Sequence, residues 1–155
     1  MKAKSFLIFL VCVVAASTFY FSCLKPPQFS ETPEINFVSI NSTNVMEQAD
    51  SIKMVIGFKD GDGDLGVHQD DTSTNCFITD IRPGKPDYTY GYRIPFITPN
   101  GTVKDISGQI SISLPGITCI PGRTIDSVTY KIKIRDRVGH LSNEVETPLI
   151  LVTCQ

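Results

Sequence analysis

The feature that most restricts the fold of this chain is a two-residue alternation of apolar and polar side chains. It is clearest over residues 127–135, where Val128, Tyr130, Ile132 and Ile134 alternate with polar or charged neighbours. Successive side chains of a strand point to opposite faces, so this pattern predicts one face in a core and the other in water. No window of helical length shows the three- and four-residue spacing of an amphipathic helix. The chain is therefore predicted to be all-β.

Six further runs of β-branched and aromatic residues are separated by glycines and prolines; they are 34–41, 51–58, 75–82, 88–96, 106–114 and 144–152. The last run contains Pro148, which lacks an N–H for the ladder, and is expected at the edge of a sheet. About seven short strands in roughly 120 residues predict a β-sandwich of immunoglobulin or fibronectin type III type. A closed barrel of similar strand number is the alternative.

The N-terminal segment has the order of a bacterial export signal. Lys2 and Lys4 precede an apolar run over residues 6–16, and Ser22 stands directly before Cys23. The segment resembles a lipoprotein signal, which implies removal of residues 1–22, a lipid on Cys23 and, from the residues that follow the cysteine, an outer-membrane location. Two alternatives stay open. An ordinary signal peptidase could cut after residues 15–17, or uncleaved residues 5–24 could span a bilayer, because they carry no charge.

Residues 24–33 contain three prolines and predict a stiff, extended tether. The predicted organisation is thus a signal peptide (1–22), a tether (23–33) and one β-domain (34–155). Removal of 22 of the 155 residues takes away two of 14 basic residues, which leaves 12 against 16 acidic ones and a formal charge of minus four. The basic residues are scattered and form no patch, so nucleic acid is not an expected partner.

Three cysteines remain in the predicted β-domain, Cys76, Cys119 and Cys154, in a compartment that permits disulfides. One bridge and one free thiol is the simplest arrangement, and Cys76 with Cys119 is the predicted pair. Cleavage by the ordinary peptidase would leave Cys23 as a fourth thiol and make the number even.

The sequence Asp-Gly-Asp-Gly-Asp-Leu-Gly at residues 60–66 is the one motif with clear chemical potential. Carboxylates at every second residue, separated by glycines, can turn several oxygens toward one hard cation such as calcium. Aligned with a helix-loop-helix calcium loop, the candidate ligands are Asp60, Asp62, Asp64, the Gly66 carbonyl and Asp71. The likeness is partial, because Leu65 replaces the invariant glycine and strands flank the loop. A solvated Asp-Gly turn is the alternative.

Topology adds one more candidate ligand. In an immunoglobulin-type sandwich, the loops after the second and the sixth predicted strands lie at the same end, and here they are residues 59–74 and 136–142. Asp136 is therefore expected near the acidic motif, although it could simply be a turn residue that accepts bonds from its own backbone. The tether should also leave from that end. Bound calcium would then set the orientation of the domain relative to the membrane.

Residues 130–142 resemble the F strand and the F–G turn of fibronectin type III and bacterial immunoglobulin-like domains, with a tyrosine, alternating apolar residues and then Asp, Gly and Ser. The signal, the tether, the acidic motif and the D-x-x-G-x-x-S-N turn at 136–143 together resemble a group of small uncharacterised bacterial lipoproteins. That resemblance implies the fold and a place in the cell envelope, and it implies no activity.

Tyr88, Tyr90 and Tyr92 place three aromatic rings on one side of a predicted strand, as a ligand face or as a packed face of the sandwich. No signature of a nucleophile with its base is present, so the protein is not expected to be an enzyme. The favoured function is a non-catalytic, calcium-stabilised module that binds an envelope protein or acts as a spacer. The alternatives are a carbohydrate-binding accessory lipoprotein and, least favoured, a metal-dependent hydrolase, because a calcium site of carboxylates closes around its ion.

Overall fold

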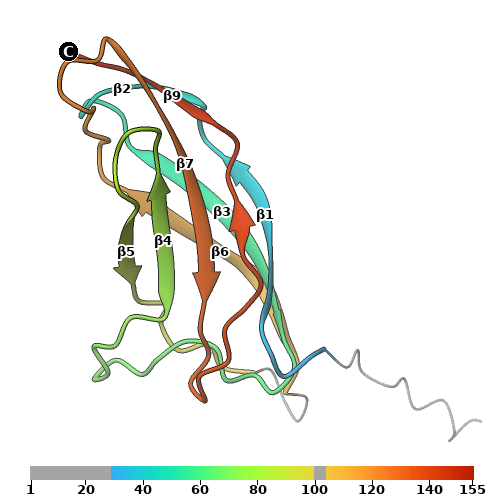
Figure 1. The fold of residues 1–155 in the computed structure, drawn as a ribbon. Helices are drawn as coiled ribbons and strands as arrows, with labels where there is room; N and C mark the ends of the chain where they lie inside the picture. The colour runs from blue at the N-terminus through green and yellow to red at the C-terminus, as the bar shows by residue number, and fades with distance from the viewer. Residues whose placement is uncertain (1–28, 100–103) are drawn as a thin grey trace, which may run out of the picture.

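The computed structural model of the chain describes residues 29–99 and 104–155 (Figure 1). The predicted signal peptide, Cys23 and residues 23–28 of the predicted tether lie outside the described residues. No helix of the described part is long and apolar enough to cross a membrane.

The described residues form nine strands in two sheets that pack face to face (Figure 1). The smaller sheet has the order β1 (Glu34–Ile40), β3 (Ile52–Asp60) and β6 (Ile106–Leu114). The larger sheet has the order β2 (Asn44–Met46), β9 (Ile150–Thr153), β7 (Ile125–Ile134), β4 (Cys76–Ile81) and β5 (Tyr88–Tyr92), and β8 (Val145–Glu146) pairs with β7. The chain is therefore an all-β sandwich with immunoglobulin-like strand order, as predicted, and it is not a closed barrel.

The core lies between the two sheets and follows the predicted alternation. Ile52, Met54 and Ile56 of β3 are fully buried, and so are Ile132 and Ile134 of β7. Lys53 of β3 and Lys133 of β7 lie between these buried residues and are exposed, whereas Val55 of β3 is half-buried. The two-residue period therefore orients both central strands and fixes which face of each sheet contributes to the core.

Two details of the strands differ from the sequence-based prediction. Strand β2 was not predicted, because only three residues pair and a single one of them, Val45, is buried. The predicted edge position of the last strand is wrong. Pro148 lies between β8 and β9, so β9 forms a regular ladder with β7 on one side and a parallel ladder with β2 on the other.

The predicted Cys76–Cys119 disulfide is also wrong, because the bridge joins Cys119 to Cys154. Cys76 is the first residue of β4 and points into the core, whereas Cys119 lies in the connection after β6, at the other end of the sandwich. The backbone N–H of Cys154 donates to the Thr124 carbonyl, which holds the C-terminal segment against that connection. Cys76 remains a free thiol, and burial raises its pKa to about 12.

Candidate metal centre

Two loops meet at the end of the sandwich where the chain enters β1 (Figure 1). Residues 61–75 connect β3 to β4, and residues 135–144 connect β7 to β8. One carboxylate oxygen from each of Asp60, Asp64 and Asp136 lies within 4.8 Å of the other two. The predicted meeting of the two loops is therefore confirmed, and we call this end of the molecule the acidic pole.

The first loop is folded by one of its own aspartates. Oδ2 of Asp60 accepts hydrogen bonds from the backbone N–H groups of Asp64, at 3.0 Å, and Leu65, at 3.1 Å. The Leu65 side chain is completely buried and anchors the loop to the core. Gly66 has a positive φ of 85°, and a side chain there would collide with the Pro95 carbonyl. The loop therefore needs Leu65 and Gly66 in these positions for reasons of packing.

Four carboxylate oxygens at the acidic pole are buried and have no hydrogen-bond partner in the described part of the chain. They are Oδ1 of Asp60, Oδ1 of Asp62 and both carboxylate oxygens of Asp64. Asp60 itself is fully buried. Buried polar atoms are normally satisfied, and a buried charge needs a partner to offset the cost of leaving water. The acidic pole therefore has oxygen donors and negative charge that a bound cation could offset.

Electrostatics at the pole oppose the ionised state of its carboxyl groups. Burial raises the pKa of Asp60 to about 6, and the nearby charges of Asp62 and Asp64 add to that rise. Burial also raises the pKa of Asp64, as do the charges of Asp136 and Asp62, whereas Arg137 and the backbone N–H of Val138 oppose the rise. A divalent cation would remove this repulsion, because opposite charge nearby favours the ionised form.

Asp136 lies close to Asp60 and Asp64, as predicted, and it also forms a turn, whereas its role as a metal ligand stays a prediction. Its Oδ1 accepts bonds from the backbone N–H groups of Gly139, at 2.6 Å, and His140, at 2.7 Å, which closes the turn after β7. Oδ2 lies 2.9 Å from Nδ1 of His140. Asp136 is therefore a turn-forming residue, and the turn holds its carboxylate against the first loop.

Three predicted ligands lie outside the group formed by Asp60, Asp64 and Asp136. Oδ1 of Asp62 is buried without a hydrogen-bond partner, but Asp62 does not converge with the other three carboxylates. The Gly66 carbonyl accepts a hydrogen bond from Nη1 of Arg137 at 3.0 Å. Asp71 lies at the surface, and its Oδ1 accepts the Ser73 N–H at 2.8 Å. The sequence analysis did not single out Arg137, which also donates to the Leu65 carbonyl and stacks on the Phe96 ring at 4.6 Å. Arg137 could have been predicted from its place directly after Asp136, because the loop that carries both residues was expected to contact the acidic motif.

The described end of the tether packs against the acidic pole, as predicted. The Gly61 N–H donates to the Ser30 carbonyl at 2.8 Å, and a side chain on Gly61 would collide with the backbone of Phe29. On the other loop, the Asn143 side chain accepts the Ile35 N–H and donates to the Ile35 carbonyl, both at 2.8 Å. The segment that leads into β1 is therefore held by the same two loops that carry the aspartates.

The three tyrosines of β5 do not form one flat surface. Tyr90 and Tyr92 are half-buried and line a pocket, whereas Tyr88 is exposed and packs edge-to-face on Tyr90 at a centroid distance of 4.8 Å. Their pairing partners on β4 are Ile78, Cys76 and Asp80, which point into the sandwich. The tyrosine side chains are therefore on the inner side of the sheet, at its open edge.

A second buried charge cluster, which the sequence analysis missed, lies at the opposite end of the sandwich. Nε and Nη2 of Arg82 donate to the two oxygens of Asp80, both at 2.7 Å, and Nη1 lies 3.2 Å from Asp126. Arg123 pairs with Asp126 at 2.5 Å, and Lys85 lies 3.8 Å from Asp80. We call these five residues the arginine cluster. The spacing of Asp80 and Arg82 was a usable signal, because residues two apart in an extended segment share a face.

Comparison of the chain with protein-family models, with curated proteins and with solved structures finds no match in any of the three. The fold and the two charge clusters define the molecule as an immunoglobulin-like β-sandwich with an uncompensated acidic pole.

Proposed function

We propose that the protein is a non-catalytic module of the bacterial cell envelope, anchored by a lipid on Cys23, whose acidic pole binds calcium. The observation that carries the proposal is the set of four buried, unpartnered carboxylate oxygens on Asp60, Asp62 and Asp64. Asp136 completes the group from the second loop. No described residue donates a hydrogen bond to any of the four oxygens, so a bound cation could take the place of the missing donors.

The donor set favours calcium over other common cations. Every candidate ligand is a carboxylate oxygen, which suits a hard cation and not a metal that prefers sulfur or imidazole. Calcium accepts six to eight oxygens in flexible geometry at about 2.3–2.6 Å, whereas magnesium demands a near-ideal octahedron and keeps several waters. Four aspartates offset by Arg137 leave a formal charge of minus three, which a divalent ion reduces without reversing.

Calcium at this pole would act on the tether as well as on the domain. The two loops that would share the ion also hold Ser30 and Ile35 through hydrogen bonds to Gly61 and Asn143. An ion that joins the loops would therefore stabilise the docking of the segment that leads from the membrane anchor. The domain would keep a defined orientation to the membrane while it binds an envelope protein or serves as a spacer.

Thermal unfolding in millimolar calcium and in chelator tests the metal proposal. At a free calcium concentration of about 100 times the Kd, linkage adds about 2.7 kcal/mol, which corresponds to a rise in Tm of roughly 5–10 °C for a domain of this size. Asp64→Asn should abolish the rise. Asp71→Asn, a matched change of an exposed aspartate in the same loop, should leave it intact. An equal Tm in calcium and in chelator would refute the proposal.

The effect on the tether is tested separately with a spin label at Glu31→Cys in a protein that carries Cys12→Ser and Cys23→Ser. Glu31 is exposed, and Cys76 is too deeply buried to compete for the label. Calcium should reduce the mobility of the label. Gly61→Ala should keep the calcium-dependent Tm but release the label, because its methyl group displaces Phe29 and Ser30. A label that ignores calcium would contradict the role in orientation and leave the metal site standing.

A further inference from the structure

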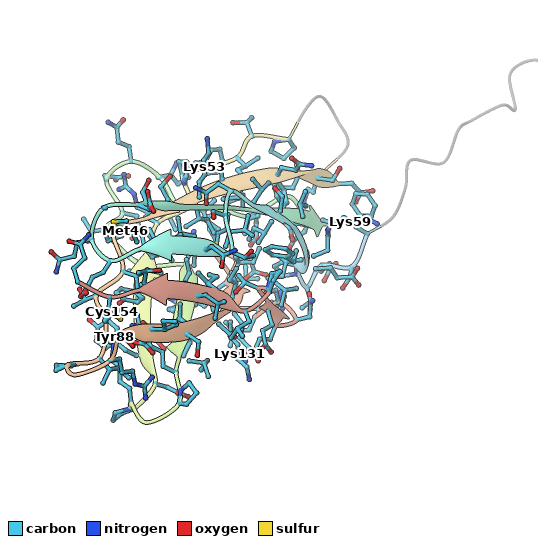
Figure 2. All side chains as sticks on the ribbon, turned by 90° about the horizontal axis from the view of Figure 1, so that it is seen from above. Met46, Lys53, Lys59, Tyr88, Lys131 and Cys154 are labelled. Atoms are coloured by element: carbon cyan, nitrogen blue, oxygen red, sulfur yellow. A yellow bond between two sulfur atoms is a disulfide. The ribbon has the colours of Figure 1, made fainter. Side chains whose placement is uncertain are left out.

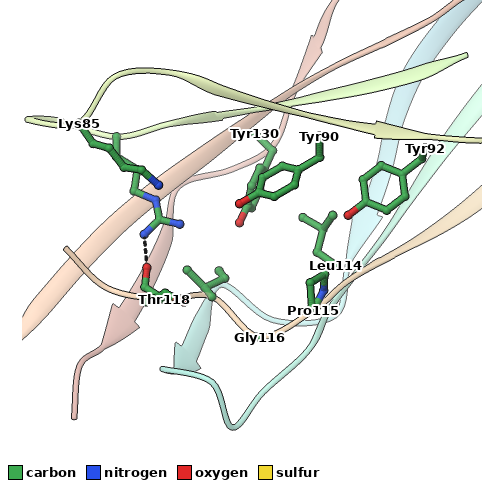
Figure 3. Close-up of a pocket in the computed structure, with 10 residues that line it drawn as sticks. Lys85, Tyr90, Tyr92, Leu114, Pro115, Gly116, Thr118 and Tyr130 are labelled. Carbon is green, nitrogen blue, oxygen red and sulfur yellow. Dashed lines mark hydrogen bonds between the residues drawn. The ribbon is translucent and has the colours of Figure 1, made fainter. Parts of the chain in front are cut away.

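A pocket at the end opposite the acidic pole is lined by tyrosines, cationic side chains and apolar groups. We propose that the pocket between β5 and the β6–β7 connection binds a six-membered ring that carries a carboxylate. The cavity has a volume of about 190 Å³, and the side chains around it are shown in Figure 3. The proposal is independent of calcium, because none of the acidic-pole aspartates lines this cavity.

Every ionisable side chain that lines the pocket is a cation or a tyrosine. Tyr90, Tyr92 and Tyr130 lie side by side on one wall (Figure 3), and Arg82 and Lys85 add positive charge. The lining contains no carboxylate. A ligand that supplies hydrogen-bond acceptors and negative charge therefore matches the wall, whereas a cationic ligand would meet Arg82 and Lys85.

The tyrosine hydroxyls at the mouth are available as donors. Burial is the main effect that raises the pKa of Tyr90 and of Tyr92, and no hydrogen bond to a described residue contributes for either group. Both phenols therefore stay protonated at neutral pH. The Tyr130 hydroxyl lies deeper, and its side chain is 2 % exposed. Tyr90 and Tyr92 are consequently the two groups that can donate to an incoming carboxylate or hydroxyl.

Lys85 supplies the charge that selects an anion. The arginine cluster contains three cations, Arg82, Arg123 and Lys85, against two carboxylates, Asp80 and Asp126, so one positive charge is left over. Arg82 is buried and fully engaged with its partners. The Lys85 ammonium lies 3.8 Å from Asp80, and its side chain is 39 % exposed. Lys85 is therefore the loosely held cation that can turn to a ligand.

The remaining wall sets the size and shape of the ligand. Leu114 and Pro115 face the tyrosines across the cavity (Figure 3), and Ile117 also lines it. An inserted ring would therefore contact apolar groups on one side and aromatic faces on the other. The cavity is smaller than the roughly 300–1,000 Å³ of pockets for drug-sized ligands. It suits one ring, either an acidic sugar residue at the end of a polysaccharide or a free aromatic carboxylate.

Titration of the isotope-labelled full-length protein, followed by NMR, tests the proposal with galacturonate, benzoate and neutral galactose. At least one acid should shift the signals of Tyr90, Tyr92 and Lys85 in a saturable way at about millimolar concentration, and galactose should bind at least about tenfold more weakly. Preference for galacturonate identifies a polysaccharide end as the source, and preference for benzoate identifies a free aromatic acid.

Three variants make the result specific. Lys85→Gln should remove the difference in affinity between the acids and galactose. The variant should still fold, because the Lys85 side chain is partly exposed. Tyr92→Phe should weaken binding about threefold to tenfold, as expected for one lost hydrogen bond. Tyr88→Phe, outside the pocket, should have no effect. Absence of saturable shifts for both acids up to about 20 mM, equal binding of galactose, or an unchanged preference in Lys85→Gln would overturn the proposal.

Discussion

The acidic pole and the arginine cluster are two buried groups of carboxylates that solve the same electrostatic problem differently. Strand β7 connects them, because Asp126 lies near its first residue and Asp136 follows its last. At the arginine cluster, each carboxylate has a cation of the protein within hydrogen-bonding distance. At the acidic pole, four carboxylate oxygens have no donor among the described residues. The comparison indicates that the carboxylates at one end are neutralised by the protein itself, whereas those at the other end keep oxygens that the proposed ion would occupy.

The two ends also differ in how their loops are closed. Near the arginine cluster, the Cys119–Cys154 bridge fixes the connection whose Thr118 carbonyl and Ile120 N–H contact Arg82 and Asp126. Figure 2 shows Cys154 and Met46 at this end and Lys59 at the other. No disulfide joins the two loops of the acidic pole in the described part of the chain. Calcium would join its two loops as the disulfide joins the segments at the opposite end.

The largest expected effect comes from removal of the central cation of the arginine cluster. Arg82→Met leaves Asp80 and Asp126 buried with weaker partners, which should cost about 3–5 kcal/mol of the free energy of unfolding. Urea denaturation measures the loss, and calcium should not restore it. Lys131→Met breaks an exposed pair with Glu144 and should have a much smaller effect, because solvent screens surface pairs. A comparable cost for the two variants would contradict the distinction between a buried cluster and a surface pair.

Removal of the disulfide should have the next largest effect. The bridge closes a sequence separation of 35 residues, so Cys119→Ser with Cys154→Ser should lower the free energy of unfolding by about 2–4 kcal/mol. Calorimetric titration should show calcium affinity unchanged, because the bridge lies far from the acidic pole. A large fall in affinity would show that the two ends are coupled.

The pH dependence of stability should have opposite signs at the two ends. Asp60 has a pKa raised from 3.8 to about 6, so the folded metal-free protein binds more protons than the unfolded chain between these values. Its stability should therefore fall as pH rises from about 4 to about 6, by roughly 1–2 kcal/mol. Urea denaturation in chelator at several pH values measures this fall, and Asp60→Asn should remove it.

Asp126 should behave in the reverse way. Burial alone would raise its pKa, but hydrogen bonds from the N–H groups of Ile120 and Ser127 and from Arg123 and Arg82 lower it overall. The contribution of Asp126 to the free energy of unfolding is fully present above its ordinary pKa of 3.8. It is lost as pH falls through the lower pKa of Asp126 in the folded protein. Stability that rises steadily from pH 4 to pH 6 in chelator would contradict the assignment of an uncompensated carboxylate at Asp60.

The smallest expected effect is that of Asp64→Asn on stability, and its sign should differ between chelator and calcium. Neither side-chain oxygen of Asp64 has a hydrogen-bond partner of good geometry among the described residues, and only the Val138 N–H is near enough to lower its pKa. Asp64→Asn therefore removes charge and at most one weak bond. In chelator the variant should be more stable than the parent by about 1 kcal/mol, because one source of repulsion is gone. In calcium it should be less stable than the parent. Destabilisation in both conditions would indicate that the Asp64 charge is paired.

Much of the fold follows from local pattern. The alternation in residues 52–58 and 128–134 determined which side chains are buried, and the immunoglobulin-like strand order then predicted that Asp136 would meet Asp60 and Asp64. Strand β2 could not be predicted in this way, since three residues are too few to show a period. The Cys119–Cys154 disulfide was not predicted, because the pairing depends on which end of the sandwich each cysteine occupies and local pattern does not specify this.

The ligand set was predictable only in part. Asp60, Asp62 and Asp64 follow from spacing. The helix-loop-helix alignment wrongly extended the site to Asp71, because the chain after Leu65 pairs through Val67 with Pro95 and Asp71 stays at the surface. Arg137 takes the carbonyl of Gly66, a contact between distant segments that no local motif encodes. Local spacing thus identifies the candidate oxygens, and the tertiary arrangement decides which of them converge.

The most direct test of the central claim is a crystal structure of the protein grown in millimolar calcium, with anomalous scattering to identify the ion. We predict one calcium bound between the two loops, with oxygens of Asp60, Asp64 and Asp136 at about 2.3–2.6 Å. Asp62 should lie in the same coordination sphere, directly or through water. Density for water alone among these carboxylates, or aspartates turned away from one another, would contradict the account.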